Sequence, residues 1–369
     1  MIEKKTSFSK IIIYSEISWN FLEQRHHHLA KYFADKNYQV EFVQRVFSRV
    51  PSVREIVSRI ILESAGNSKS PIRKDIPCNV TLRRSLFLPL DFPLSGIYNW
   101  ILWFCFERRH QKNAIVYSFV NNPFLIGGDF PIGARYSLSV FDIIHNWWES
   151  PWRKRLHSVM ADRNIKAFDK VVTDSPLIAK DLVYKKIPHH MMLPGAGPEW
   201  LNISSTSTKV APVFFGNLRL NSDVELIRCI SGKYSTDLLG LIHSSVADSI
   251  GEAHYLGEFN TADLIKRVSN YNVILLPYDQ GEFSKTIAPA KYFEALATGA
   301  LVVTGADMSH LPGFNDFVFR VDSLSHKALD GLQEAIAAQS INRQAQVAFA
   351  GQHLWKKRFE DLFFFLEVE

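Results

Sequence analysis

The sequence contains little cysteine. Cys78, Cys105 and Cys229 are the only three in 369 residues, and they lie far apart. An odd number of distant cysteines excludes a disulfide framework and a Cys-x-x-Cys metal site, and it favours a reducing compartment. Charge of one sign is also scarce, because 42 Lys and Arg oppose 37 Asp and Glu and leave a net charge of +5. This excess is too small to indicate a nucleic-acid-binding protein, so we predict no nucleic-acid partner.

Long hydrophobic runs are missing as well. The first ten residues are polar and precede only a four-residue apolar run, so they lack the apolar core of a secretory signal peptide. The aromatic stretch 97–106 is too short to span a bilayer. We therefore expect a cytoplasmic protein, and peripheral attachment to the inner face of the cell membrane stays open as an addition to this.

Length and composition indicate a folded chain of two domains. Apolar residues make up 47% and charged residues 21% of the sequence, which is ordinary for globular proteins, and one core rarely extends over so many residues. Short β-rich runs alternate with segments of helical length, which is typical of α/β domains with parallel sheets. The expected strands are 11–14, 39–43, 114–119, 136–141 and 170–173 in a first series, and 213–216, 237–242, 273–276, 301–304 and 317–321 in a second.

A polar segment without periodicity, 202–209, lies between the two series and predicts an interdomain linker. The first domain is then 1–201 and the second is 210–351. Strand runs such as 273–276 are apolar without alternation, as expected for doubly wound sheets covered on both faces. Ligands of such sheets bind outside the carboxyl ends of the strands, so the residues that follow each strand are the candidates for function.

The segment after the strand 273–276 carries the clearest chemistry. Pro289 suits the first turn of a helix whose amino end faces a loop containing Ser284, Lys285 and Thr286. Free backbone N–H groups, a lysine and two hydroxyls at one place are suited to a diphosphate. Glu294 follows one turn later, and Gly299 is expected to end the helix in a left-handed cap. The alternative is a surface loop with ordinary charges.

Several segments resemble retaining GT-B glycosyltransferases. The donor-nucleotide signature of that family is similar to VILLPYDQGEFSKTIAPAKYFEALATGALVVTG, and its first phosphate loop and base-binding stretch are similar to FFGNLRLNSDVELI and YLGEFNTADLIKRVSNYNVILLPY. VFDIIHNWWESP and KVVTDSPLIAKDL resemble parts of its first domain, and HLWKKRFEDLFFFLEVE resembles its terminal helix. The resemblance implies two Rossmann-like domains facing an interdomain cleft, with the C-terminal helix, 352–369, crossing back to the first domain.

The resemblance also implies a donor site. Glu294 matches the ribose-binding glutamate of the family, whereas Thr286 stands where a second glutamate often contacts the donor sugar, and Glu282 lies four residues too early to replace it. A basic residue commonly follows the phosphate-loop glycine, and here the nearest charge is Arg219. The predicted nucleotide- and phosphate-binding residues are Gly216, Asn217, Arg219, Gly257, Ser284, Lys285, Thr286 and Glu294. Because the sequence contains no Asp-x-Asp, we expect neither a metal nor another cofactor.

Two further groups complete the predicted site in the first domain. Asp142 and His145 follow a strand closely and are the predicted catalytic residues, with positioning of substrate favoured over general base catalysis and a structural role for His145 as the alternative. Trp19 and Arg25 follow the first strand and are predicted to bind the acceptor, although Trp19 could equally pack on the next helix. Consecutive helical residues point in different directions, so we interpret His26–His28 as solvated surface.

Together these features predict a metal-independent, retaining glycosyltransferase. It would move a sugar from a nucleotide diphosphate sugar, UDP-sugar before GDP-sugar, to a growing bacterial-type surface polysaccharide or lipid-linked glycan. An epimerase of the same architecture is less favoured, and the alternative from another class is a catalytically silent scaffold or partner subunit that still binds nucleotide. Aromatic residues next to basic clusters at 97–112 and 147–155 suggest attachment to an anionic membrane, with a buried helix as the alternative for 97–106.

Overall fold

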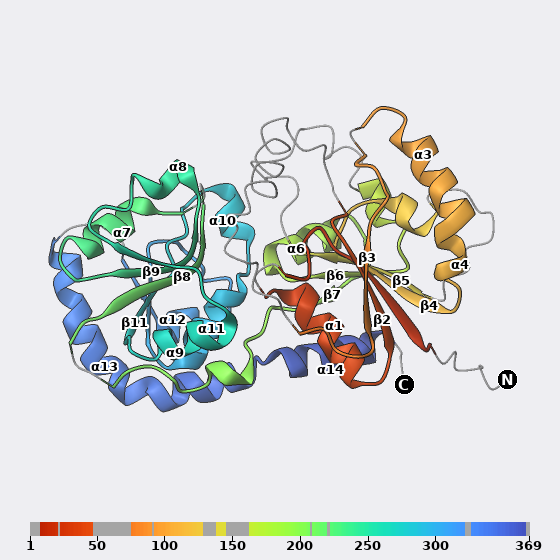
Figure 1. Cartoon of the computed structure of the whole chain (residues 1–369). Coiled ribbons are helices and arrows are strands. Elements are labelled where there is room, and N and C mark those ends of the chain that lie inside the picture. Colours follow the sequence, from red (N-terminus) through yellow and green to blue (C-terminus); the bar gives the residue numbers. More distant parts are fainter. Residues whose placement is uncertain are drawn as a thin grey trace. The chain divides into compact units, whose positions relative to one another are not determined.

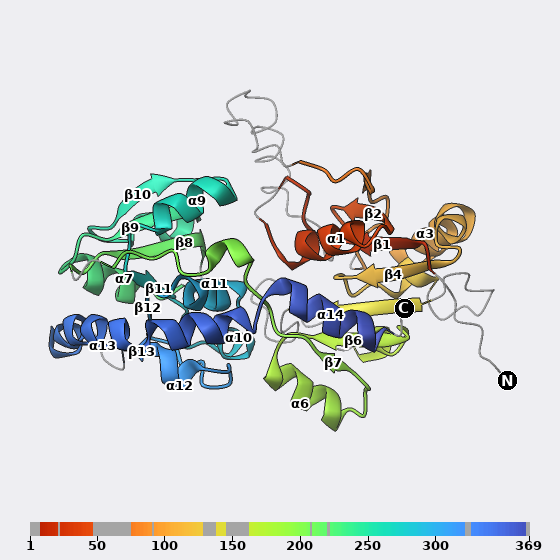
Figure 2. The same cartoon turned by 90° about the horizontal axis from the view of Figure 1, so that it is seen from below.

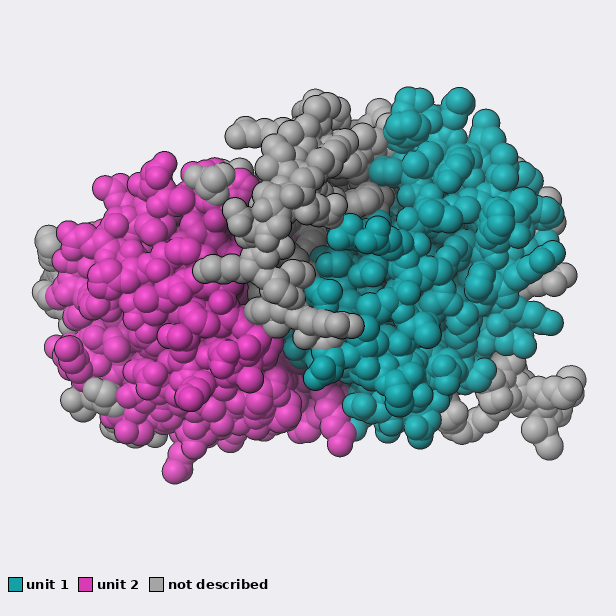
Figure 3. All heavy atoms as spheres, in the orientation of Figure 1, with its two compact units in different colours: residues 1–174, 178–192, 359–369 teal, residues 175–177, 193–358 magenta. Residues whose placement is uncertain are grey.

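A computed structural model describes residues 8–20, 23–46, 75–90, 92–127, 138–144, 162–206, 209–219, 222–321 and 326–366. The chain divides into two compact units (Figures 1 and 3). Unit 1 contains Met1–Asp174, Ile178–Met192 and Phe359–Glu369, and unit 2 contains Ser175–Leu177 and Leu193–Arg358.

Apart from the three residues Ser175–Leu177, the chain passes from unit 1 to unit 2 between Met192 and Leu193. This boundary lies before the linker expected at 202–209. Residues at the start of that polar segment are held by unit 2, because the backbone N–H groups of Asn202, Ser204 and Ser205 donate to the carbonyls of Ala297, Thr298 and Tyr271. The start of this polar segment is therefore bound to unit 2 through its backbone, although its composition is that of a linker.

Unit 1 is built on a seven-stranded sheet with the order β3-β2-β1-β4-β5-β6-β7, in which every neighbouring pair is parallel. The strand order reverses between β1 and β4, so this is the point where a doubly wound sheet opens a crevice for ligands. Its strands are β1 (Lys10–Tyr14), β2 (Gln39–Gln44), β3 (Val80–Arg84), β4 (Ala114–Ser118), β5 (Leu138–Ile143), β6 (Lys170–Thr173) and β7 (His190–Met191).

Helices connect these strands, as the right-handed crossovers of a parallel sheet require. The described helical segments of this part of the chain are α1 (Arg25–Asp35), α3 (Ser95–Leu102), the π-helical turn η1 (Trp103–Glu107), α4 (Arg108–His110), the 3₁₀ turn η2 (Pro123–Ile126) and α6 (Pro176–Tyr184).

Unit 2 contains a six-stranded parallel sheet with the order β10-β9-β8-β11-β12-β13. This is the strand order of dinucleotide-binding folds, with the reversal between β8 and β11. The strands are β8 (Pro212–Leu218), β9 (Asp237–Ile242), β10 (His254–Gly257), β11 (Val273–Leu275), β12 (Leu301–Thr304) and β13 (Val318–Arg320). The described helical segments are η3 (Pro198–Trp200), α7 (Val224–Ser231), α8 (Ser244–Ala247), α9 (Thr261–Val268), α10 (Glu282–Thr286), α11 (Ala290–Thr298), α12 (Phe314–Phe317) and α13 (His326–Gly351).

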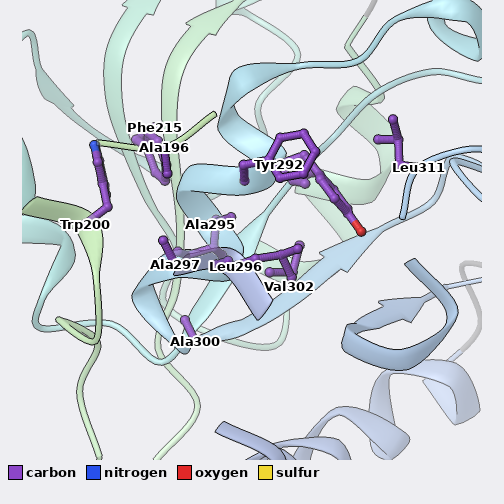
Figure 4. Packing of buried hydrophobic residues seen from close by; sticks show 14 of the residues in the cluster. Ala196, Trp200, Phe215, Tyr292, Ala295, Leu296, Ala297, Ala300, Val302 and Leu311 are labelled. Carbon is purple, nitrogen blue, oxygen red and sulfur yellow. The ribbon is translucent and has the colours of Figure 1, made fainter. Parts of the chain in front are cut away.

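The central strands of the unit 2 sheet are buried on both faces, as their unalternating apolar runs predict. Phe215 and Val302 belong to a cluster with Tyr292 and Leu296 of α11 (Figure 4). The neighbouring strand residues, including Phe214, face the opposite cluster with α7 and α13. Alternate residues of one strand thus serve two cores, which fixes the register of the sheet.

The last helix, α14 (Trp355–Phe365), begins in unit 2 and ends in unit 1. Within unit 1, α14 lies beside β6 and β7 (Figure 2). Phe359 packs on Tyr32 with ring centroids 5.4 Å apart, and the Phe365 ring stacks on His190 at 4.7 Å. The prediction that the C-terminal helix returns to the first domain is confirmed by these contacts.

Three strands escaped prediction because they lie at or beside a sheet edge and lack a continuous apolar run. β3 and β10 are edge strands with exposed side chains, and β7 pairs over only two residues. The predicted strand 136–141 extends to Ile143 in the structure, so that Asp142 lies within β5 and not after it.

Candidate functional site

The reversal of strand order in unit 2 brings two loops together. Arg219 follows β8, and Tyr278 follows β11. Ser222 and Tyr278 form an antiparallel bridge, and the N–H of Asp223 donates to the carbonyl of Pro277 at 2.8 Å. The residues that follow these two strands are therefore held side by side at the edge where such sheets bind ligands.

Gly216 allows a lysine to lie directly on β8. The φ angle of Gly216 is +118°, and a Cβ atom added to it would lie 1.9 Å from Cε of Lys291. On the next strand, a Cβ on Gly240 would lie 2.1 Å from the carbonyl oxygen of Gly216. Glycine is required at both positions, and the predicted phosphate-loop glycine thus places the side chain of Lys291, at the start of α11.

Lys291 lies among charges of both signs. Burial lowers the pKa of its ammonium group to about 8, with Glu294 opposing the shift and Arg219 adding to it. The ammonium nitrogen lies 5.4 Å from the centroid of the Phe214 ring. Two cations therefore meet one carboxylate at this edge, which is an environment suited to a bound anion.

The other predicted donor residues are placed as follows. With its amide oriented to satisfy both groups, Asn217 accepts hydrogen bonds from Nη2 and Nε of Arg219 at 2.8 and 2.9 Å. Burial raises the pKa of the Tyr278 hydroxyl, and Glu294 raises it further. Gly257 ends β10, two strands from β8, and has a φ angle of +100° with open space beside its Cα.

The segment 284–286 is the short helix α10, and not the loop that the sequence predicts. Ser284 is 1% exposed, and its hydroxyl donates to the carboxylate of Asp279. Lys285 is exposed and Thr286 is half-buried. The helix forms because Gly281 precedes it in an extended conformation and Asp279 holds its first turn through Ser284. Pro289 is the extended N-cap of α11 and does not lie in its first turn as predicted, whereas the predicted left-handed end at Gly299, with φ +76°, is confirmed.

The edge of unit 1 carries a buried ion-pair cluster. Nη2 of Arg25, in the first turn of α1, lies 2.9 Å from Oδ2 of Asp142, and Nη1 lies 3.5 Å from Oδ2 of Asp174. The hydroxyl of Tyr117 donates to Oδ2 of Asp142 at 2.6 Å. All three charged side chains are at least nine-tenths buried, and the other carboxylate oxygens of both aspartates have no hydrogen-bond partner among the described residues.

Burial governs the protonation of this cluster. It raises the pKa of Asp142, with Arg25 and Tyr117 opposing the shift. Burial also raises the pKa of Asp174 to about 7, with Arg25 opposing and Asp142 adding to the shift. One guanidinium cannot balance two buried carboxylates, so the cluster takes up a proton near neutral pH.

Two expectations for the neighbouring residues are changed by burial. Trp19 is fully buried against His27 and Phe42, with ring centroids 5.4 and 5.2 Å away. Of the two alternatives for Trp19, the structure therefore favours packing on the next helix over contact with an acceptor. His26 and His27 are buried, so the expectation of a solvated histidine surface is wrong. The His26 ring stacks on Phe119 at 3.8 Å, because α1 packs on the sheet through this face.

His145 and the basic cluster 147–155 lie outside the described residues. Sequence reasoning missed three members of the two clusters. Lys291 lies three residues before Glu294, a spacing that places both on one helix face. Asp174 directly follows β6 and Tyr278 lies three residues after β11, so the strand-end rule that selected Asp142 would also have found them.

Among the residues that the structure describes, no three His, Cys, Asp or Glu side chains are grouped so that they could hold a metal ion. None of the described helices combines the length and the apolar character needed to cross a membrane.

Comparisons with known proteins find no match by sequence but several by structure. No protein-family model matches the sequence, and no curated protein matches it. Among solved structures, WaaG, a glycosyltransferase involved in lipopolysaccharide biosynthesis, is 13% identical with a TM-score of 0.61, over 96% of this chain and 99% of that one. TarM is 7% identical with a TM-score of 0.60, over 98% and 99% of the two chains. AviGT4, a glycosyltransferase involved in avilamycin A biosynthesis, is 11% identical with a TM-score of 0.53, over 97% and 98%.

The fold is GT-B. The architecture predicted from the sequence, two Rossmann-like α/β domains with a returning C-terminal helix, is therefore confirmed. In the GT-B chain described here, unit 2 presents two cations and a carboxylate at its strand-order reversal, and unit 1 presents a buried cluster at the corresponding edge of its own sheet.

Proposed function

We propose that the protein is a glycosyltransferase that moves a sugar from a nucleotide diphosphate sugar to a glycan acceptor. The observation that carries the proposal is the pair of cations, Lys291 and Arg219, at the ligand-binding edge of a dinucleotide-type sheet in a GT-B fold. A diphosphate is the anion that such an edge suits, since two cations facing one carboxylate leave an excess of positive charge.

In the proposed donor complex, Lys291 and Arg219 hold the diphosphate, and Glu294 accepts hydrogen bonds from the ribose hydroxyls. The base lies toward Gly257, because no heavy atom beyond its neighbours in the chain lies within 4 Å of the position that a Cβ of this residue would take. The two cations take the part that a metal plays elsewhere in stabilising the leaving phosphate, so we propose a metal-independent reaction. Retention of anomeric configuration and preference for UDP-sugar over GDP-sugar follow from the sequence resemblance and are proposed on that ground.

For the acceptor we propose a growing surface polysaccharide or a lipid-linked glycan. Support comes from the fold neighbours, one of which is involved in lipopolysaccharide biosynthesis, while a variant of S. aureus TarM was solved with alpha-GlcNAc-glycerol and UDP. A lipid-linked acceptor is met at a membrane, so this function implies contact with an anionic membrane surface.

Unit 1 contributes through its buried cluster. Arg25 and Asp142 lie beneath the surface, so we propose that they position the strand ends and the helix start that face the acceptor, without touching the sugar. The role predicted for His145 stays a prediction.

Binding of nucleotides by calorimetry tests the proposal. UDP, GDP, ADP and TDP would each be titrated into the protein with magnesium and again with EDTA. We expect one nucleoside diphosphate to bind in both buffers. The sugar nucleotide that contains this nucleoside diphosphate should be consumed when membrane glycan acceptors are added. Nuclear magnetic resonance of the product would report its anomeric configuration.

Absence of binding by every nucleotide would contradict the donor site. Binding without sugar transfer to any acceptor, or hydrolysis alone, would favour the alternative of a catalytically silent scaffold that retains the nucleotide site.

A further inference from the structure

The helical segment formed by α3 and η1 presents an apolar side to solvent. On its protein-facing side, the polar residues Ser95, Asn99 and Glu107 are buried beside Leu102 and Trp103 of the unit 1 core. Its solvent-facing side is apolar, although a helix on a water-soluble surface normally has the opposite arrangement. The exposed apolar residues of the segment and the turn before it are Leu94, Ile97, Tyr98, Ile101, Phe104 and Phe106.

Hydrogen bonds on the buried side fix this orientation. The Asn99 amide both accepts from the N–H of Leu88 and donates to its carbonyl, each at 2.8 Å. Glu107 is held by the guanidinium of Arg83 and by the hydroxyl of Tyr14 at 2.9 Å. A rotation that buried the apolar side would leave these polar groups without partners, so the helix is built to present its apolar side outward.

The apolar side forms a continuous strip. Leu94 is 77% exposed, Ile97 is 63% exposed and Ile101 is 48% exposed, and their spacings of three and four residues place them along one helix face. Phe104, three residues after Ile101, continues this face, and Phe106 of η1 is exposed two residues later. Single exposed apolar residues are common on soluble proteins, whereas a contiguous row indicates a surface that meets something apolar.

The exposed charges directly after the strip are all positive. Between Phe92 and Asn113 the only acidic residue in the sequence is Glu107, and it is buried against Arg83. The guanidinium of Arg108 lies 5.4 Å from the centroid of the Phe104 ring. Arg109, His110 and Lys112 are exposed directly after it. An apolar strip flanked by cations matches the boundary of an anionic bilayer, where headgroups attract the cations and acyl chains accept the strip.

We propose that α3 and η1 lie in the interface of an anionic membrane, with the strip from Leu94 to Phe106 inserted and Arg109 and Lys112 on the headgroups. A second copy of the chain is a poorer occupant, because symmetric pairing would bring the two cationic flanks together. The inference rests on the proposed function in one respect, because attachment would bring the protein to the membrane that contains a lipid-linked acceptor. Attachment itself requires no sugar transfer.

Vesicle flotation with the full chain tests the proposal, using phosphatidylcholine vesicles with and without phosphatidylglycerol. The Ile97→Ser/Ile101→Ser variant should lose about tenfold or more in membrane partitioning, because two large apolar side chains no longer enter the bilayer. The Arg109→Ser/Lys112→Ser variant should lose about tenfold on anionic vesicles and little on neutral ones. Val183→Ser/Tyr184→Ser removes two other exposed apolar residues of unit 1, 67% and 86% exposed, and should float as wild type.

Cys105 offers a direct probe of insertion, because it is exposed within η1. In a Cys78→Ser/Cys229→Ala background, an environment-sensitive fluorophore on Cys105 should shift to the blue when anionic vesicles are added. Thermal unfolding of each variant in solution, compared with wild type, shows that loss of flotation is not loss of fold.

Three outcomes would overturn the proposal. Wild type could fail to float on anionic vesicles, the Ile97→Ser/Ile101→Ser variant could float as well as wild type, or the same variant could abolish a dimer seen by light scattering while flotation is unchanged. The last outcome would assign the strip to a second copy. Nucleotide binding measured in solution on the same samples separates these failures from failure of the donor site.

Discussion

The carboxyl edges of the two sheets contain opposite imbalances of charge. In unit 1, one cation, Arg25, faces two carboxylates, Asp142 and Asp174, and all three are buried. In unit 2, two cations, Lys291 and Arg219, influence one carboxylate, Glu294, and Lys291 is only half-buried. The same position in two sheets of the same class therefore supports two different electrostatic tasks.

The two sheet edges differ in how their excess charge is neutralised. The acidic excess in unit 1 is closed off from solvent and is balanced by a proton, as the pKa of Asp174 near 7 indicates. The basic excess in unit 2 is open enough to be balanced by a ligand. A buried, self-neutralised cluster serves stability and positioning, whereas a cationic edge left unneutralised serves binding.

Removal of Arg25 should have the largest effect. Arg25→Met leaves two buried carboxylates without their cation, and breaking a buried pair in this way costs about 3–5 kcal/mol of unfolding free energy. Urea denaturation measures the loss. Arg228→Met is the matched control, because its pair with Glu225 is more than half exposed on both sides and should contribute less than about 1 kcal/mol. Equal losses in the two variants would show that unit 1 has no special cluster.

Removal of Lys291 should affect binding and spare stability. Folding already disfavours the charge of Lys291, so Lys291→Met should unfold at a free energy equal to or above that of wild type. Its nucleoside diphosphate affinity should fall by about 10- to 100-fold, the loss expected for a charged hydrogen-bond donor. In wild type the affinity should also weaken as pH rises through about 8, where the ammonium loses its proton.

Calorimetry across that pH range, with the exposed Lys266→Met variant as control, checks both effects. An unchanged dissociation constant in Lys291→Met would remove this residue from the donor site.

The sequence was sufficient for the features that depend on local pattern. Unalternating runs such as 301–304 predicted strands covered on both faces, and Gly299 predicted the end of α11. It was insufficient where a contact joins distant segments. The burial of Asp142 depends on β5 ending two residues later than predicted, and the contact of Lys291 with Gly216 arises only because α11 packs against β8.

Per pH unit, the pH dependence of unit 1 should be smaller than the loss in Arg25→Met. Because the pKa of Asp174 is raised to about 7 in the folded protein, the folded state holds more protons than the unfolded state between about pH 4 and pH 7. Stability therefore falls as pH rises through this window, by at most about 1.4 kcal/mol per pH unit, and levels above it. Asp174→Asn should remove this slope in urea denaturation, whereas the exposed Asp35→Asn should keep it. A slope unchanged in Asp174→Asn would contradict the proton-balanced cluster.

The smallest expected effect concerns α10. Ser284→Ala removes the hydroxyl that bonds Asp279 and should cost about 1 kcal/mol of unfolding free energy, because the first turn of α10 loses its anchor while nucleotide affinity stays the same. Lys285→Ala, one residue later and exposed, should leave stability within about 0.5 kcal/mol. Parallel urea denaturation and nucleotide titration distinguish the two roles. A loss of affinity in Ser284→Ala or Lys285→Ala would support the predicted phosphate-binding role of α10 and extend the cationic edge of unit 2 beyond Lys291 and Arg219.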